Sequence, residues 1–263
     1  MPTVTQHAPG SFCWPELGTT DQNAAKQFYG SLFGWTFRDT AMGPGEIYTI
    51  FQLGGRDCAA LYTLRPDMLK QGVPPHWESY VAVASADAAA ARAKQIGGTV
   101  MMEPFDVMDA GRMAVFQDPI GSVFCVWQAK QHPGVGVLAE PGSLAWTQLN
   151  AKQPAPAKQF YAQLFGWKAQ DDPMPGGGGD YTTFLLNGQP IGGIMPMPPD
   201  VPASAPSHWL TYFASADVDA TAANVTGGGG RTMVPPTDIP GMGRFAVFQD
   251  PQGAFFAAVQ FRM

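Results

Sequence analysis

The stretch AAKQFYGSLFGW at residues 24–35 returns as APAKQFYAQLFGW at 155–167, and the two copies align at a spacing of 132 residues. The chain has 263 residues, so this spacing is about half its length. A second segment repeats at the same spacing: GRMAVFQDPIGSVF at 111–124 returns as GRFAVFQDPQGAFF at 243–256. A repeat held in register over such a length predicts two copies of one domain.

The segment between the two copies has the composition of a linker, because KQHPGVGVLAEPG is rich in Gly and Pro. We predict domains over residues 10–130 and 143–263, joined by a linker at 131–142. Charged residues make up only 14% of the chain, whereas Gly (31) and Pro (25) are abundant. This balance favours many short strands joined by turns over a helical bundle.

Composition excludes several classes of partner. The formal net charge is −6 and the pI is about 5.1, so we expect no nucleic-acid partner. No apolar run approaches the roughly 20 residues that span a bilayer, and the N-terminus lacks the pattern of a signal peptide, so we expect no membrane partner. Three cysteines without a CxxC pair indicate unpaired thiols in a reduced, cytoplasmic protein.

Each half of the chain shows the order β-α-β-β-β twice. FCWPELG at 12–18 is strand-like, and TTD supplies a helix N-cap before apolar residues at helical spacing. Three strand-like segments follow, and ESYVAVAS then starts a second strand, helix and three-strand series. Residues 118–121, with the sequence DPIG, have the chemistry of a hairpin turn.

This order, with TTDQNAAKQFYGSLFGW and AGRMAVFQDPIG, resembles the vicinal oxygen chelate superfamily of glyoxalases, extradiol dioxygenases and bleomycin-resistance proteins. It is most similar to the two-domain, glyoxalase-like branch labelled hydroxylase or mycobacterial antigen. The resemblance covers residues 12–260 and implies an α+β fold. Each domain would consist of two βαβββ modules that form a curved, mostly antiparallel eight-stranded cup with outer helices. Because a fold does not fix a reaction, function must be argued from the site.

The resemblance implies that any metal ligands come from the first and last strands of each module, usually as His, Glu or Gln. In the first domain these positions hold Trp14, Ala60, Glu78 and Cys125. Strand alternation places Phe12, Trp14 and Glu16 on one face. Indole and methyl groups cannot bind a metal, so the set is incomplete.

The second domain offers fewer ligands still, and its corresponding residues are Trp146, Gly193, Leu210 and Ala257. We therefore expect no metal site and no cofactor. One alternative stays open, because strand register read from sequence is uncertain by about two residues. In that alternative a soft ion such as Zn²⁺ is held by Glu16, Cys58, His76, Glu78 and Cys125.

Without a metal, the concave faces still predict a small-molecule site, since such sites are apolar cavities with a few placed polar groups. The expected ligand-binding residues of the first domain are Trp14, Tyr62, His76, Tyr80, Met113, Cys125 and Trp127. Those of the second domain are Trp146, Gln148, His208 and Tyr212. Glu16 and Glu78 are the candidate catalytic residues, because carboxyl groups near indole rings have raised pKa values and serve as acid or base. The alternatives are core packing for the tryptophans and solvent contact for the carboxylates.

His76 and His208 each follow a Pro-rich segment and precede Trp, which favours a strand start at the cavity mouth. A histidine there binds a ligand or donates a proton, since it titrates near neutrality. The alternative is that each imidazole satisfies backbone groups where a loop meets the sheet.

The leading hypothesis is a metal-independent protein, monomeric or homodimeric, that binds a small, partly apolar organic molecule. It either sequesters that molecule or acts on it by acid–base chemistry, first of all in the first domain. One alternative is a lyase or dioxygenase of glyoxalase type with a degenerate metal site in the first domain. The other is a non-catalytic interaction or signalling protein.

Overall fold

The computed structural model describes residues 3–174, 178–199 and 201–262. The elements of the first domain are β1 (Phe12–Thr19), α1 (Gln22–Phe33), β2 (Thr36–Gly43), β3 (Glu46–Leu53), β4 (Arg56–Thr63), α2 (Pro66–Lys70), β5 (His76–Ala82), α3 (Ala86–Gln95), β6 (Thr99–Val107), β7 (Gly111–Gln117) and β8 (Val123–Ala129). Those of the second are β9 (Leu144–Ala151), α4 (Pro154–Phe165), β10 (Lys168–Pro173), β11 (Asp180–Leu186), β12 (Gln189–Pro196), β13 (His208–Ala214), α5 (Val218–Gly227), β14 (Arg231–Ile239), β15 (Gly243–Gln249) and β16 (Phe255–Phe261).

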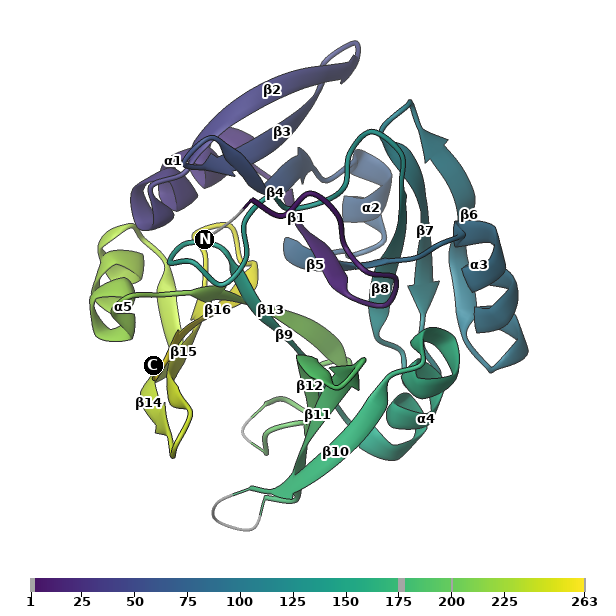
Figure 1. Cartoon of the computed structure of the whole chain (residues 1–263). Coiled ribbons are helices and arrows are strands. Elements are labelled where there is room, and N and C mark those ends of the chain that lie inside the picture. The colour runs from purple at the N-terminus through teal and green to yellow at the C-terminus, as the bar shows by residue number, and fades with distance from the viewer. Residues whose placement is uncertain (1–2, 175–177, 200, 263) are drawn as a thin grey trace.

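The strands form two eight-stranded sheets, in the orders β2-β3-β4-β1-β5-β8-β7-β6 and β10-β11-β12-β9-β13-β16-β15-β14 (Figure 1). In each sheet the first and last strands of a module pair in parallel, and the two modules meet through antiparallel central strands. The predicted tandem duplication of an eight-stranded fold is confirmed. The short helix α2, between β4 and β5, is not part of the predicted order of strands and helices. No helix in the described part of the chain has the length and apolar character needed to cross a membrane.

Local sequence explains where the repeated helix begins and ends. Asp21 caps α1 by accepting from the backbone N–H of Ala24 at 3.0 Å, as the TTD motif predicts. Gly34 ends the helix with φ at +70°, a left-handed conformation that glycine adopts without a steric penalty. The helix buries Phe28 and Tyr29 on the face of the sheet opposite the cup.

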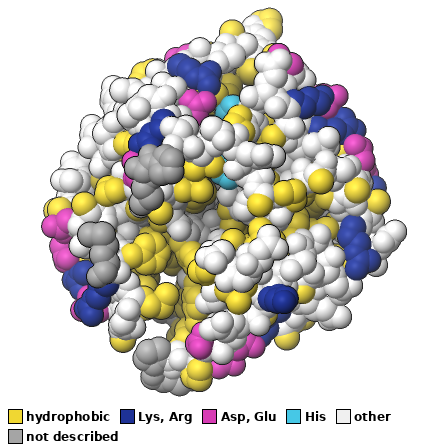
Figure 2. Space-filling model, viewed as in Figure 1, with side chains coloured by type: hydrophobic (Ala, Val, Ile, Leu, Met, Phe, Trp, Pro, Cys, Tyr) yellow, Lys and Arg dark blue, Asp and Glu magenta, His cyan; other side chains and the backbone are white. Residues whose placement is uncertain are grey.

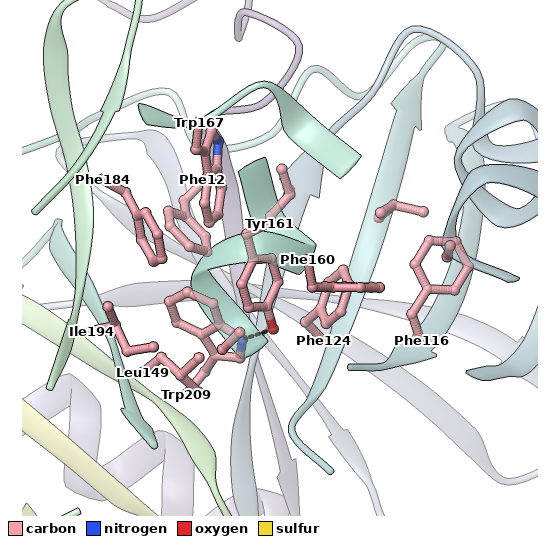
Figure 3. Close-up of a cluster of buried hydrophobic side chains, with 14 of the residues drawn as sticks. Phe12, Phe116, Phe124, Leu149, Phe160, Tyr161, Trp167, Phe184, Ile194 and Trp209 are labelled. Atoms are coloured by element: carbon pink, nitrogen blue, oxygen red, sulfur yellow. Dashed lines mark hydrogen bonds between the residues drawn. The ribbon is translucent and has the colours of Figure 1, made fainter. Parts of the chain in front are cut away.

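One predicted face assignment is wrong. Phe12 does not share a face with Trp14, because a β-bulge between them shifts the register of β1 against β5. Phe12 packs instead on the helix-covered face, with its ring 5.2 Å from that of Trp209 in the second domain (Figure 3). The bulge turns Cys13 into the cup beside Trp14.

The two domains share their cores through the helix-covered faces. One core joins α1 and the first module of the first domain to α5 and the last strands of the second. The other joins α3, β7 and β8 to α4 and the first module of the second domain. Figure 1 shows α1 beside α5 on one side and α3 beside α4 on the other. Each cup therefore faces away from the domain interface.

The repeated motifs bind one another across this interface. The phenol of Tyr29, in the first QFY copy, donates to Asp250 Oδ2 in the second QDP turn at 2.9 Å. Trp77 Nε1 in turn donates to the Tyr29 hydroxyl at 3.0 Å. All three residues are buried, so the chain of bonds satisfies polar groups that water does not reach.

The same arrangement occurs with the domains exchanged. Tyr161 donates to Asp118 Oδ2 at 2.8 Å. Trp209 Nε1 donates to the Tyr161 hydroxyl at 3.0 Å, as Figure 3 shows. Asp118 also holds its own turn by accepting from the backbone N–H groups of Ile120 and Ser122, which confirms the predicted hairpin turn. The sequence repeat thus encodes a reciprocal contact between the two halves.

Candidate functional site

The helix-free face of the first sheet, here called the first cup, carries two carboxyl groups side by side. Glu16 on β1 and Glu78 on β5 are direct cross-strand partners in the antiparallel register. Such partners have Cβ atoms about 5 Å apart. Glu16 is only 7% exposed and accepts hydrogen bonds from two phenols: Tyr48 to Oε1 and Tyr80 to Oε2, the latter at 2.7 Å.

The environment of Glu16 favours its protonated form. Burial, and then the nearby Glu78 carboxylate, raise the pKa of Glu16 to about 8, against the lowering effect of the two phenol hydrogen bonds. At neutral pH this carboxyl group therefore retains its proton. A buried acid that titrates near neutrality is suited to general acid–base work.

Glu78 lies nearer the mouth of the first cup and binds three side chains. His76 Nε2 is 3.1 Å from Glu78 Oε1, the Tyr62 hydroxyl donates to the same oxygen at 3.3 Å, and Cys125 Sγ is 4.0 Å from Oε2. These contacts connect predicted site residues from β4, β5 and β8.

His76 must share a proton with Glu78. Its Nδ1 is 2.7 Å from the carbonyl oxygen of Pro74, which only accepts, so Nδ1 carries a hydrogen. Nε2 faces the carboxylate, so one of those two groups must be protonated. Burial lowers the pKa of His76, but the hydrogen bond and negative charge of Glu78 outweigh that effect and leave the pKa above its ordinary value.

The other titratable groups of the first cup remain neutral. Burial, reinforced by the neighbouring carboxylates, raises the pKa of the Tyr48 and Tyr80 phenols and of the Cys125 thiol well above their ordinary values. The phenols are therefore hydrogen-bond donors, and Cys125 is a neutral, buried thiol rather than a nucleophilic thiolate.

The predicted aromatic residues do line the first cup, but they are covered. Trp14 and Trp127 are 6% and 8% exposed, and Tyr80 packs between them and Met113. Trp14 Nε1 donates to the Tyr48 hydroxyl at 3.2 Å. Its ring also meets that of His132, with centroids 4.5 Å apart.

Sequence reasoning missed two of these residues. Tyr48 joins Trp14 to Glu16, and the only signal was its aromatic counterpart Tyr181 in the second copy. His132 lies in the predicted linker and is not among the expected site residues. The linker folds back onto the cup, which local sequence patterns do not encode.

The second cup repeats the aromatic part of this arrangement without its carboxylates. Trp146 Nε1 donates to the Tyr181 hydroxyl at 2.8 Å. Gln148, at the position of Glu16, donates to Asn150 Oδ1 at 2.9 Å, and Asn150 Nδ2 lies 3.2 Å from His208 Nε2. This network contains no carboxyl group.

His208 and Tyr212 complete the second cup. His208 Nδ1 is 2.9 Å from the Pro206 carbonyl oxygen, so both repeated histidines satisfy a proline carbonyl, the alternative considered from sequence. Tyr212 packs against Phe245. Trp146 is only partly buried, unlike Trp14, and Val259 stands where the first domain has Trp127. Figure 2 shows the surface hollowed over the second sheet, with hydrophobic side chains around the hollow.

The donors present do not fit a divalent metal ion. Cys58 packs in the core shared with the second domain and not with Ala60, so it cannot join Glu16. Within the described residues, no group of three or more His, Cys, Asp or Glu side chains is arranged to hold a metal. The carboxyl groups of Glu16 and Glu78 are engaged by phenols and an imidazole.

Comparison with known proteins agrees with this fold. The Glyoxalase/Bleomycin resistance protein/Dioxygenase superfamily matches the chain twice, over residues 12–126 and 143–257. The chain belongs to this superfamily.

Two kinds of relative align with the chain over nearly its whole length. The chain is 40% identical to "Putative glyoxylase CFP32" of Mycobacterium tuberculosis, over 99% of this chain and 98% of that one. It is 34% identical to "Anthracycline biosynthesis protein DnrV" of Streptomyces peucetius, over 98% and 96% of the two chains.

Solved structures share the fold at low sequence identity. The Mn(II)-bound glyoxalase from Novosphingobium aromaticivorans has a TM-score of 0.67 and 16% identity, over 96% of this chain and 82% of that one. The 2,3-dioxygenase LapB from Pseudomonas sp. KL28 has a TM-score of 0.68 and 13% identity, over 98% and 94%.

Proposed function

We propose that the protein binds a small, partly apolar organic molecule in the first cup and acts on it by acid–base chemistry, without a divalent ion. One observation carries this proposal. Glu16 and Glu78 face each other across two central strands, and the environment of Glu16 raises its pKa to about 8. A carboxyl group with a raised pKa beside a second carboxyl group is a usual basis of acid and base roles.

The proton path follows from the contacts. Glu16 is the buried acid, and Glu78 stands between it and His76. The His76 side chain is 31% exposed, so it exchanges protons with solvent. A molecule against Glu16 would receive a proton from the buried carboxyl group, and His76 and Glu78 would restore it.

The names of the relatives are compatible with this chemistry but do not fix the substrate. One is called a glyoxylase and the other an anthracycline biosynthesis protein, so both names concern organic molecules. A test panel should therefore contain small keto acids and planar aromatic ketones. The partly apolar lining of Trp14, Tyr80, Met113 and Trp127 favours the second group.

The decisive experiment combines a ligand panel with variants of the acid. Binding is followed by thermal shift and calorimetry on wild type, Glu16→Gln and Glu78→Gln, and turnover of any ligand found is followed against pH. We expect Glu16→Gln, which keeps the shape of the side chain but replaces one of its two acceptor oxygens with an amide NH₂ donor, to bind the ligand but to lose turnover by about 10²-fold or more.

A metal titration tests the metal-dependent alternative. If dialysed wild-type protein retained a stoichiometric divalent ion that Glu78→Ala and Cys125→Ala both released, the metal-dependent alternative would replace this proposal. Retention of full turnover in Glu16→Gln would exclude Glu16 as the acid.

A further inference from the structure

The first cup is closed by the protein's own chain. Residues 130–138, here called the strap, leave β8 and return across the start of β1. Trp127 Nε1 donates to the His132 carbonyl oxygen at 2.8 Å, and the His132 ring meets Trp14 nearly edge-on at 4.5 Å. Val135, further along the strap, is completely buried beside Cys13 and Trp14.

The strap lies against the strand backbone so closely that only glycine fits at one position. The Val135 N–H donates to the Cys13 carbonyl oxygen at 2.8 Å. A Cβ on Gly134 would lie 2.5 Å from that same oxygen, and Gly134 has φ at +118°. Both the space and the backbone conformation therefore require glycine there.

Further contacts hold the strap in place, but the Nε2 atom of its His132 has no hydrogen-bond partner among the described residues. Gly136 N donates to the Asp57 carbonyl oxygen at 2.7 Å, and His7 Nε2 donates to the Val135 carbonyl oxygen at 3.0 Å. His132 Nε2 is 3.6 Å from Asp57 Oδ2, beyond hydrogen-bond distance. The strap is thus attached by backbone bonds, which a conformational change could exchange with water, and by the buried side chain of Val135.

We propose that the strap occupies the ligand site of the first cup as a stand-in for the ligand, and that the site admits a flat ring compound with a carbonyl acceptor when the strap lifts. This inference rests on the proposed function. The strap presents a flat ring to Trp14, a carbonyl oxygen to the Trp127 indole N–H and an aliphatic group beside Cys13. A ligand that replaces it must satisfy the same groups, because the freed indole N–H would otherwise remain unpaired in an apolar site.

A ligand in the place that the strap occupies would lie beside Glu16. Trp14 and Glu16 share a face of β1 and are two residues apart, which is about 6.6 Å along a strand. A ring seated on Trp14 would therefore extend toward Glu16 and the phenol of Tyr48.

The experiment uses the full chain with Gly134→Ala, which should push the strap away without altering any cup residue. Gly45→Ala is the matched control, since Gly45 has φ at +77° at a hairpin tip and its Cβ would meet nothing within 4 Å. His132→Ala is the second strap variant, in case Gly134→Ala does not fold. Thermal unfolding establishes that each variant is folded.

Two readouts are compared. Thiol labelling, mapped by mass spectrometry, should become faster at Cys13, under the strap, in the strap variants than in wild type or Gly45→Ala. Acetophenone, a flat ring with a carbonyl, should bind at least about tenfold more tightly to the strap variant than to wild type or Gly45→Ala, because the binding-competent fraction rises. Ethylbenzene, which lacks the carbonyl, should gain less.

The outcomes separate the strap from the reaction. Unchanged Cys13 labelling and unchanged acetophenone affinity in both strap variants would overturn the proposal that the strap covers the ligand site. The role of Glu16 as the acid is tested separately, by the loss of turnover in Glu16→Gln. Faster labelling without a gain in acetophenone affinity, or an equal gain for ethylbenzene, would overturn the ligand class. Faster labelling with a selective gain for acetophenone supports both parts.

Discussion

Removal of the Tyr29 hydroxyl by Tyr29→Phe should destabilise the whole protein, not only one domain. The phenol accepts from Trp77 Nε1 and donates to Asp250 Oδ2, and both partners are buried. Phenylalanine leaves a buried donor and a buried carboxylate oxygen without this partner, and each such loss costs about 1–3 kcal/mol. Asp250 Oδ1 keeps its three backbone N–H donors, so we expect a total loss of about 2–4 kcal/mol.

The assay is equilibrium unfolding in urea, followed by both fluorescence and circular dichroism. Tyr161→Phe is the matched variant, because Tyr161 makes the same two bonds to Trp209 and Asp118. The two losses should be similar, and they should add in the double variant because the two sets share no partner. Ser11→Ala, which removes an exposed hydroxyl, should cost less than about 0.5 kcal/mol.

Three results would refute this reasoning. A loss below about 0.5 kcal/mol in both tyrosine variants would show that the buried bonds are not needed. A large loss in one variant alone would show that the two contacts are not equivalent. Separate unfolding transitions for the two domains in wild type would show that the shared cores do not couple them.

Three further predictions follow from single residues. Because the folded pKa of Glu16, about 8, lies above its ordinary value of 4.5, the folded state binds the extra proton between these pH values. Wild-type stability should therefore fall from pH 5 to 8, with a contribution from Glu16 of up to about 1.4 kcal/mol per pH unit. Glu16→Gln should remove that contribution, and an unchanged slope in urea titrations would contradict the assignment. Gly193→Ala should cost about 1–3 kcal/mol and alter Trp146 fluorescence, since the new Cβ would lie 2.1 Å from the Tyr181 hydroxyl; a neutral effect would show that Tyr181 has another position. After dialysis, elemental analysis should find less than one divalent ion per chain in wild type and in Glu78→Ala alike, and a difference between them would indicate a metal site.

The fold could be predicted from the sequence because its signals are local. Helical spacing, the Asp21 cap and the turn at Asp118 each act within a few residues, and the repeat at 132 residues fixes the domain count. The sequence predicts less well on which face of the sheet each strand side chain lies. A single bulge after Phe12 sent its side chain to the opposite face, and alternation contains no signal for a bulge.

The site could be predicted only in part, for the same reason. Glu16, Glu78 and the aromatic residues lie on regular strands, so alternation brings them together. His132 reaches Trp14 only because the linker turns back at Gly134, a long-range contact that no local pattern records. Tyr48 enters through the pairing of β3 with β4, which depends on the whole sheet.

The opening repeat also explains why the cups differ while the helices do not. The Tyr29 and Tyr161 hydroxyls each bind an aspartate of the other domain, so a change in either motif breaks a contact on both sides of the interface. Side chains of the cups contact mainly their own sheet. Glu16 in the first copy can therefore be replaced by Gln148 at the equivalent position of the second without disturbing that interface. The segments that are similar in the two halves are therefore those that make the contacts between the domains. Differences between the two halves mark where the chemistry has been free to change, and the only facing pair of carboxyl groups in the described cups lies in the first.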